Sequence, residues 1–197
     1  MQTNPLIEPP PIYTQYMTSS PPDKPPTGGP TKDEILAIAM QKLDLKPADI
    51  FADIGCGTGK VTCAVAPLVA LVHAIDIREE AFLWTSEEIR RSTITNVSMH
   101  HDNAVSILGS LEKLDVAFVG GSRDLAEVLR HLSRLRIRTV VITAVLLETL
   151  MTAVNTLKEL NMFQEVVQVQ VSKSIPLAGG LMLKPLDPVF IIHGGCT

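Results

Sequence analysis

The sequence predicts an α/β fold in which helices cover both faces of a mainly parallel sheet. From residue 31 onward, short apolar runs alternate with helix-length amphipathic segments, as expected of strands that are joined by helices. Units of this kind connect by right-handed crossovers and build one parallel sheet. A glycine-rich turn follows the first apolar run and acidic residues follow the first three, which places candidate ligand-binding groups at one edge of the sheet.

Length and composition are consistent with one domain and exclude several classes of protein. The chain has 197 residues, of which 46% are hydrophobic and 19% are charged, so it is not a disordered protein and has enough apolar surface for a core and a subunit interface. We therefore expect a homo-oligomer. The formal charge of −4 and the lack of a Lys/Arg-rich tract argue against nucleic acid as a partner.

The predicted location is the cytoplasm. The sequence has no apolar run long enough to span a membrane, and its proline-rich start is unlike a signal peptide. The three cysteines, Cys56, Cys63 and Cys196, are odd in number and form no CxxC pair. We expect free thiols and neither a disulfide framework nor a zinc or other metal site.

Residues 1–30 are predicted to form a proline-rich N-terminal arm that precedes a catalytic domain at 31–197. The arm holds most of the prolines and ends in Gly28-Gly29-Pro30, a composition that sustains neither a helix nor a central strand. Two interpretations stay open. The arm is either an unstructured tail or an extension that covers the active site or a neighbouring subunit.

The domain is predicted to begin with a helix at Thr31, because Thr31 and Glu34 have the spacing of a capping box. The parallel strands, each a short apolar run, are predicted at 50–54, 71–75, 97–100, 115–119 and 139–145. After the first helix, further helices are predicted at 60–70, 79–91, 123–134 and 147–160.

The end of the chain has a different pattern. Residues 163–173 alternate between apolar and polar with period two, and the apolar run 189–193 follows without a helix between them. Two successive strands of this kind predict an antiparallel hairpin added to the edge of the sheet.

The turn after the first strand is the most informative motif, and it reads Asp53-Ile54-Gly55-Cys56-Gly57-Thr58-Gly59. Closely spaced glycines let the backbone turn sharply and leave no side chains between the main chain and a ligand. The GxGxG spacing differs from the GxGxxG of loops that bind pyrophosphate. A preceding carboxylate suits the ammonium and sulfonium groups of S-adenosylmethionine better. We therefore predict that Asp53, Gly55, Cys56, Gly57, Thr58 and Gly59 bind this cofactor, with Cys56 present for its small size.

Polar residues after the next two strands complete the predicted cofactor site. Asp76 follows the second strand, where an acidic residue accepts hydrogen bonds from ribose hydroxyls in this topology. Asp102, Asn103 and Ala104 follow the third strand and are predicted to contact the adenine. The alternative is that each acidic residue caps the following helix.

These features together resemble the Rossmann-like, seven-stranded class I methyltransferases. More specifically, the chain from about Gly29 to Gly194 resembles the CbiT-type cobalt-precorrin C15-methyltransferases (decarboxylating). The segments that carry this resemblance are 29–35, 53–59, 74–76, 119–122 and 143–149.

The resemblance implies a function in cobalamin (corrin) biosynthesis. The enzyme would methylate carbon 15 of a precorrin or cobalt-precorrin and decarboxylate the acetate at C-12 of ring C. It also implies a homotetramer, and a separate protein for methylation at carbon 5. Thr31, the glycine turn, Asp76 and Ala104 would contact S-adenosylmethionine. Gly120, Gly121 and Ser122 would bind the substrate, unless they form only a tight turn.

Two residues are candidates for a catalytic role, Glu148 and Ser122. Glu148 follows the fifth strand, so its carboxylate would face the site, or it would simply stabilise the start of a helix. His100 and His101 are interpreted as ordinary residues at a strand end. For the substrate carboxylates, the segment between the last two strands offers Lys173 and Lys184. The arginines of 132–138 are a further possible contact.

Two alternatives stay open at this point. The chain could be a class I methyltransferase that acts on transfer RNA, protein or another small molecule. It could also be a non-catalytic cofactor-binding module in a corrin-pathway assembly. A basic groove would favour RNA, and release of S-adenosylhomocysteine would distinguish an enzyme from a module.

Overall fold

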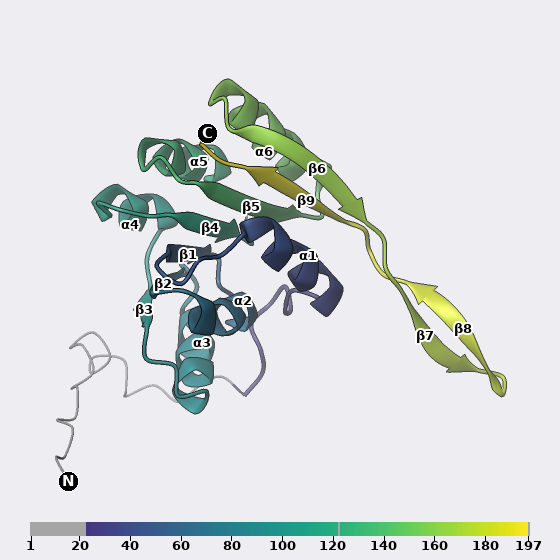
Figure 1. Ribbon diagram of the computed structural model, residues 1–197. Helices are drawn as coiled ribbons and strands as arrows, with labels where there is room; N and C mark the ends of the chain where they lie inside the picture. Colours follow the sequence, from purple (N-terminus) through teal and green to yellow (C-terminus); the bar gives the residue numbers. More distant parts are fainter. Residues whose placement is uncertain (1–22, 122, 197) are drawn as a thin grey trace, which may run out of the picture.

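The computed structural model describes residues 23–121 and 123–196 (Figure 1). Most of the predicted arm, residues 1–22, and the candidate Ser122 lie outside the described residues. The helices are α1 (Asp33–Leu43), α2 (Lys60–Val65), the 3-10 helix η2 (Ala66–Leu68), α3 (Glu79–Arg91), α4 (Ala104–Ser110), α5 (Leu125–Arg134) and α6 (Leu147–Glu159). The strands are β1 (Ile50–Ile54), β2 (Leu71–Ile75), β3 (Val97–His100), β4 (Val116–Val119), β5 (Thr139–Ala144), β6 (Phe163–Val169), β7 (Ser172–Leu177), β8 (Gly180–Pro185) and β9 (Val189–Gly194).

The main sheet confirms the predicted fold class. Its seven strands run in the order β3-β2-β1-β4-β5-β9-β6. The pairs from β3 to β5 are parallel, and β9 is antiparallel to both β5 and β6. The predicted C-terminal antiparallel pair is therefore β6 with β9.

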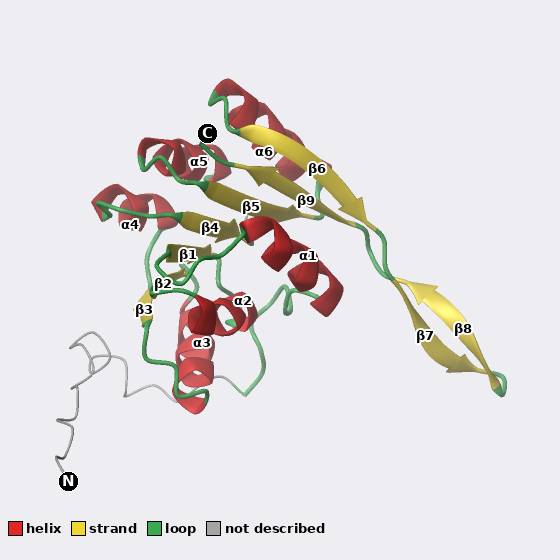
Figure 2. Ribbon diagram, viewed as in Figure 1, coloured by secondary structure: helices red, strands yellow, loops and turns green. Residues whose placement is uncertain are grey.

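Helices cover both faces of this sheet, as predicted (Figure 2). Side chains of α1, α2 and α3 pack with Phe51 and Phe118 in one buried cluster. Side chains of α4, α5 and α6 pack with Ile142 and Ile192 in a second cluster on the opposite face. Because both faces are covered, central strands such as β4 are buried along their whole length, which explains their continuous apolar sequence.

The starts and ends of two helices differ from the prediction. The capping box at Thr31 is wrong: α1 begins at Asp33, Lys32 is its N-cap, and no side chain caps it. Glu34 forms an ion pair with Lys173 instead. The predicted helix 60–70 ends at Val65 and continues as η2, where Pro67 has no N–H to continue an α-helix.

Three elements were missed: α4, β7 and β8. Helix α4 is short, and Leu108 is its fully buried side chain, so it leaves a weak periodic signal. The predicted strand 163–173 is two strands, because β6 ends at Val169 and β7 begins at Ser172. Strand β8 pairs with β7 in a separate sheet that projects from the body (Figure 1). Every residue of β8 is exposed, so it lacks the alternation by which strands are recognised.

The order of the strands indicates where a ligand would bind. It reverses between β1 and β4, which lie side by side although two strands intervene in the sequence. In open α/β sheets, ligands bind outside the carboxyl ends of the strands at such a point. Separately, no helix in the described part of the chain is both long enough and apolar enough to cross a membrane.

Candidate functional site

A cavity of about 670 Å³ lies at the carboxyl ends of the parallel strands, a size typical of small-molecule sites. It brings together most of the residues that the sequence analysis selected. Those in its lining are Thr31, Asp53, Gly55, Cys56, Gly57, Thr58, Asp76, Asp102, Asn103, Ala104, Gly120 and Gly121. Residues 27–30, at the end of the predicted arm, also line it.

The glycine turn after β1 is shaped by close packing inside the protein. Gly55 has a φ of +77°, and a Cβ there would lie 3.0 Å from the backbone nitrogen of Gly121. Gly59 has a φ of +74°, and a Cβ there would lie 2.9 Å from Thr85. Gly59 is outside the cavity lining. These two glycines therefore hold the turn against β4 and α3, whereas Gly57 borders the cavity.

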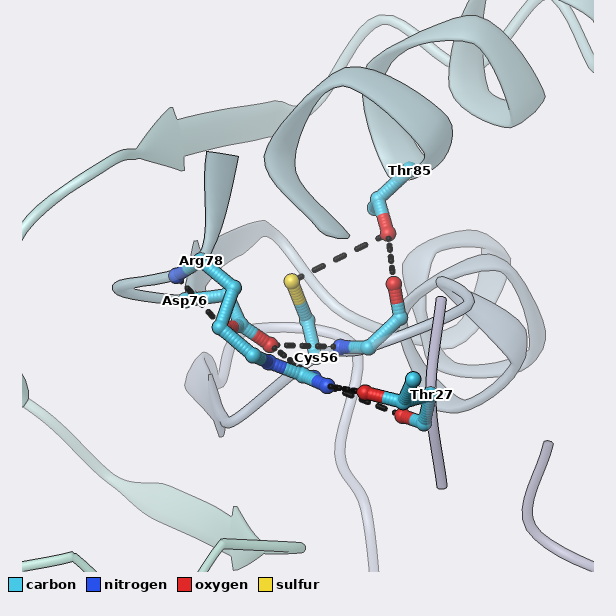
Figure 3. Close-up of polar contacts among 6 residues, drawn as sticks. Thr27, Cys56, Asp76, Arg78 and Thr85 are labelled. Carbon is cyan, nitrogen blue, oxygen red and sulfur yellow. Dashed lines mark hydrogen bonds and ion pairs between the residues drawn. The ribbon is translucent and has the colours of Figure 1, made fainter. Parts of the chain in front are cut away.

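Asp76 joins the turn to the end of β2 (Figure 3). The N–H of Gly57 donates to its Oδ2 at 3.0 Å. Arg78 donates to Oδ1 from its backbone nitrogen and Nε, and to Oδ2 from Nη2 at 2.9 Å. Burial works to raise the pKa of Asp76, but the hydrogen bonds from Arg78 and Gly57 outweigh it and lower the pKa. Asp76 is thus held ionised.

Arg78 also ties the N-terminal segment to this edge of the cavity. Its Nη1 donates to the carbonyl oxygen of Thr27 at 2.9 Å, and Figure 3 shows the guanidinium between Asp76 and Thr27. Thr85 donates to the carbonyl oxygen of Gly57 at 3.0 Å and accepts a weak hydrogen bond from Cys56. Burial raises the pKa of the Cys56 thiol, consistent with the predicted packing role.

Asp53 is the most unusual charged group in the cavity. It is 1% exposed, and Thr62 Oγ1 donates to its Oδ2 at 2.6 Å. Its Oδ1 is buried and has no partner among the described residues. Burial raises the pKa of Asp53 to about 7. An unpaired buried acceptor is costly, so this atom suits a ligand that brings a cationic donor.

The residues after β3 have a structural role whether or not they bind a ligand. Asn103 is the N-cap of α4, and its side chain accepts from the N–H of Val105 at 2.8 Å. Its Nδ2 donates to Asp124 at 3.0 Å, and Asp102 accepts from the N–H of Asn103. Helix capping is therefore established for Asn103. Contact with an adenine stays a prediction.

The other candidates lie away from this cavity. Glu148 is exposed in the first turn of α6 and borders a shallower depression beside Asp124 and Glu127. His100 contacts His73 at 3.0 Å, and His101 stacks on Phe82. None of these is in the cavity lining.

Two residues that contact the carboxylates of the site were missed by the sequence analysis. Thr62 lies on the buried face of α2, where a hydroxyl among apolar neighbours signals a buried acceptor nearby. Arg78 lies two positions after Asp76, close enough to pair with it. Whether the two side chains pair depends on the conformation of the turn between them.

Comparisons with known proteins agree on one family. A family model described as a precorrin methyltransferase domain matches residues 27–193. A probable cobalt-precorrin-6B C(15)-methyltransferase (decarboxylating) of Methanosarcina mazei is 41% identical, with 85% of this chain and 94% of the relative covered. The crystal structure of precorrin 8w decarboxylase from Methanobacterium thermoautotrophicum has a TM-score of 0.80 at 32% identity, covering 85% and 92% of the two chains. A precorrin-6y C5,15-methyltransferase of Geobacter metallireducens has a TM-score of 0.80 at 27% identity, covering 87% and 94%.

The raised pKa of Asp53 predicts a pH-dependent stability. A carboxyl whose pKa rises from 3.8 to about 7 on folding stabilises the fold while it is protonated, and this contribution is lost between about pH 4 and pH 7. The loss approaches about 1.4 kcal/mol per pH unit within that window. The Asp53→Asn substitution keeps the shape of the side chain and replaces the carboxyl by an amide that does not titrate. Urea denaturation without added ligand at pH 5 and pH 7 should show the variant gaining stability relative to the wild type as pH rises. Parallel curves for the two proteins would contradict this.

Proposed function

The chain belongs to the precorrin methyltransferase family, and on this basis we propose that it methylates carbon 15 of a precorrin or cobalt-precorrin and decarboxylates its C-12 acetate in cobalamin biosynthesis. The observation that carries the proposal is that the family match spans residues 27–193 and contains the whole lining of the cavity. The relatives named for this reaction support it. No observation on the structure favours a transfer RNA or protein substrate, or a non-catalytic module.

We propose S-adenosylmethionine as the cofactor, because the cavity has the groups that this molecule needs. Asp53 Oδ1, buried and unpaired, would accept from the ammonium group. The glycine turn would lie along the amino-acid end, Asp76 would face the ribose, and Asn103 and Ala104 would border the adenine. When bound, the cofactor supplies an electrophilic methyl group.

The residues of the chain would act mainly by positioning the substrate and the cofactor relative to each other. Bringing a nucleophilic ring carbon in line with the methyl group can lower a barrier by roughly 7–11 kcal/mol. Gly120 and Gly121 follow β4 and line the cavity beside the glycine turn, so we propose that they border the substrate. The electron pair left by loss of carbon dioxide would pass into the conjugated macrocycle, which acts as its own electron sink.

The quaternary structure is also proposed. The β7–β8 hairpin exposes Leu177, Leu181 and Leu183 by 57%, 77% and 68%, and an isolated two-stranded sheet is marginal in water. We propose that these hairpins pack against other copies of the chain in a homotetramer. The relative from Methanosarcina mazei is named for carbon 15 alone, so we propose a separate protein for carbon 5. The cytoplasmic location stays a prediction.

The reaction is tested by mass spectrometry. Incubation with S-adenosylmethionine and the isolated macrocycle should give a product with one added methyl group and one lost carbon dioxide, together with S-adenosylhomocysteine. A product that is methylated but keeps its carboxylate would contradict the decarboxylating activity. Absence of S-adenosylhomocysteine would contradict the enzyme altogether.

A variant of Glu148 tests its catalytic role in the same assay. Because its carboxylate lies outside the cavity lining, we expect Glu148→Gln to keep a single-turnover rate within about twofold of the wild type. A loss of tenfold or more would show that Glu148 reaches the substrate.

Cofactor binding should release a proton from Asp53. Below pH 7 its carboxyl is largely protonated, whereas an ammonium group beside it favours the ionised form. Affinity for S-adenosylmethionine should therefore rise between pH 5 and pH 7, by at most about tenfold per pH unit, and then level off. Calorimetry at pH 6 in buffers of different ionisation enthalpy measures the released proton. Asp53→Asn should abolish both effects, and binding without proton release would refute the role of Asp53.

The hairpin proposal predicts that charge on its apolar surface dissociates the oligomer. Light scattering coupled to size exclusion should give the mass of a tetramer for the wild type and a smaller mass for the double variant Leu181→Lys, Leu183→Lys. The matched control Leu68→Lys alters an exposed leucine of η2 and should leave the mass unchanged. A monomeric wild type would rule out the proposal.

A further inference from the structure

Two positive charges at the cavity have no ion-pair partner among the described residues. Four basic residues line it: Lys32, Lys60, Arg78 and Arg123. Lys60 pairs with Asp33 at 2.6 Å, and Arg78 pairs with Asp76 at 2.9 Å. Lys32 makes a long hydrogen bond to the carbonyl oxygen of Asp187 and no ion pair within the described chain. Arg123 has neither an ion pair nor a hydrogen bond with a described residue.

These two charges lie on segments other than those that carry Asp53 and Asp76. Asp53, Asp76 and Asp102 are at the ends of β1, β2 and β3. Arg123 follows β4, on the other side of the point where strand order reverses. Lys32 precedes α1 and reaches toward Asp187, just before β9. Of the four acidic residues in the described lining, three therefore lie at the ends of β1, β2 and β3, and the fourth, Asp187, lies beside Lys32.

An exposed aliphatic surface also borders the cavity. Val145 and Leu146, directly after β5, line the cavity and are 58% and 61% exposed. Leu147 and Met151 extend this surface along α6, with exposures of 62% and 54%. Exposed apolar side chains in a contiguous run commonly mark a binding surface. Val145 and Leu146 line the same cavity as the acidic residues, Lys32 and Arg123.

The other basic residues that the sequence analysis considered either form ion pairs with other side chains or lie outside the cavity lining. Lys173 pairs with Glu34 at 2.9 Å, and Lys184 is on the exposed strand β8. Arg138 pairs with buried Asp49 at 2.6 Å, just before β1. It therefore lies at the amino ends of the strands, opposite the cavity. Neither the hairpin nor the turn before β5 supplies a cation to the cavity lining.

We propose that Lys32 and Arg123 are specificity-determining residues that hold carboxylates at the rim of the substrate, while its ring lies against Val145 and Leu146. The inference rests on the proposed function, since it assumes a flat apolar ring that carries carboxylates. A guanidinium can bind a carboxylate through two parallel hydrogen bonds, and an ammonium acts as a point charge. The combination selects a ring with acidic arms over an uncharged ring of the same size.

The test uses uroporphyrin, a stable tetrapyrrole rich in carboxylates, and measures its affinity by fluorescence titration of the full chain. Arg123→Gln and Lys32→Gln should each weaken binding about tenfold, and the double variant by roughly the product. Leu146→Ser should also weaken binding severalfold. Added salt should weaken binding to the wild type more than to the double variant. Affinity for S-adenosylhomocysteine should stay within about twofold throughout, which separates substrate contacts from the cofactor site.

Two matched controls make the result decisive. Lys184→Gln removes an exposed cation of β8 outside the cavity lining, and Leu68→Ser removes an exposed leucine of η2; both should bind as the wild type. The inference is overturned if Arg123→Gln and Lys32→Gln bind uroporphyrin as tightly as the wild type, or if Lys184→Gln loses as much affinity as they do. It is likewise overturned if the wild type does not bind uroporphyrin. It is also overturned if Leu146→Ser changes the oligomeric mass without changing ring affinity. In each case cofactor calorimetry and mass spectrometry still decide the proposed function independently.

Discussion

The structure depends on the close approach of β1 and β4 where the strand order reverses. At their carboxyl ends Gly55 lies so near Gly121 that a Cβ on Gly55 would be 3.0 Å from its backbone nitrogen. Any larger residue at Gly55 would separate the two turns. Because these turns meet, the residues after β1, β2 and β3 and those after β4 and β5 line one continuous cavity. A methyl donor and its acceptor can therefore lie side by side in it.

Two sets of charged side chains line this cavity. In the first, Asp76 is held ionised by Arg78 and Gly57, and Asp53 is buried with one oxygen unpaired. In the second, Lys32 and Arg123 lack ion-pair partners among the described residues, and Val145 and Leu146 line the same cavity with exposed aliphatic side chains. A cationic cofactor and an anionic substrate would be sorted by this arrangement, because like charges placed together are penalised.

The N-terminal segment is part of this cavity. Residues 27–30 line it, and Arg78 connects Thr27 to the carboxylate of Asp76. The predicted boundary at residue 30 therefore marks a change in the sequence pattern. Residues from both sides of this boundary line the cavity. Residues 1–22 lie outside the described part of the chain, so both interpretations of the arm stay predictions.

The sequence by itself determined the fold class, the order of the strand segments along the chain and twelve of the residues that line the cavity. Buried strands, glycine spacing and acidic residues at strand ends are local patterns, and each follows from burial or backbone conformation at that point in the chain. The tertiary structure decided what local patterns do not contain. It showed that Arg78 pairs with Asp76, that Thr62 donates to Asp53, that Glu148 is outside the cavity lining, and that β7 and β8 form an exposed hairpin. These depend on which elements the folded sheet brings together, because a pairing or a missing partner is a property of neighbours distant in sequence.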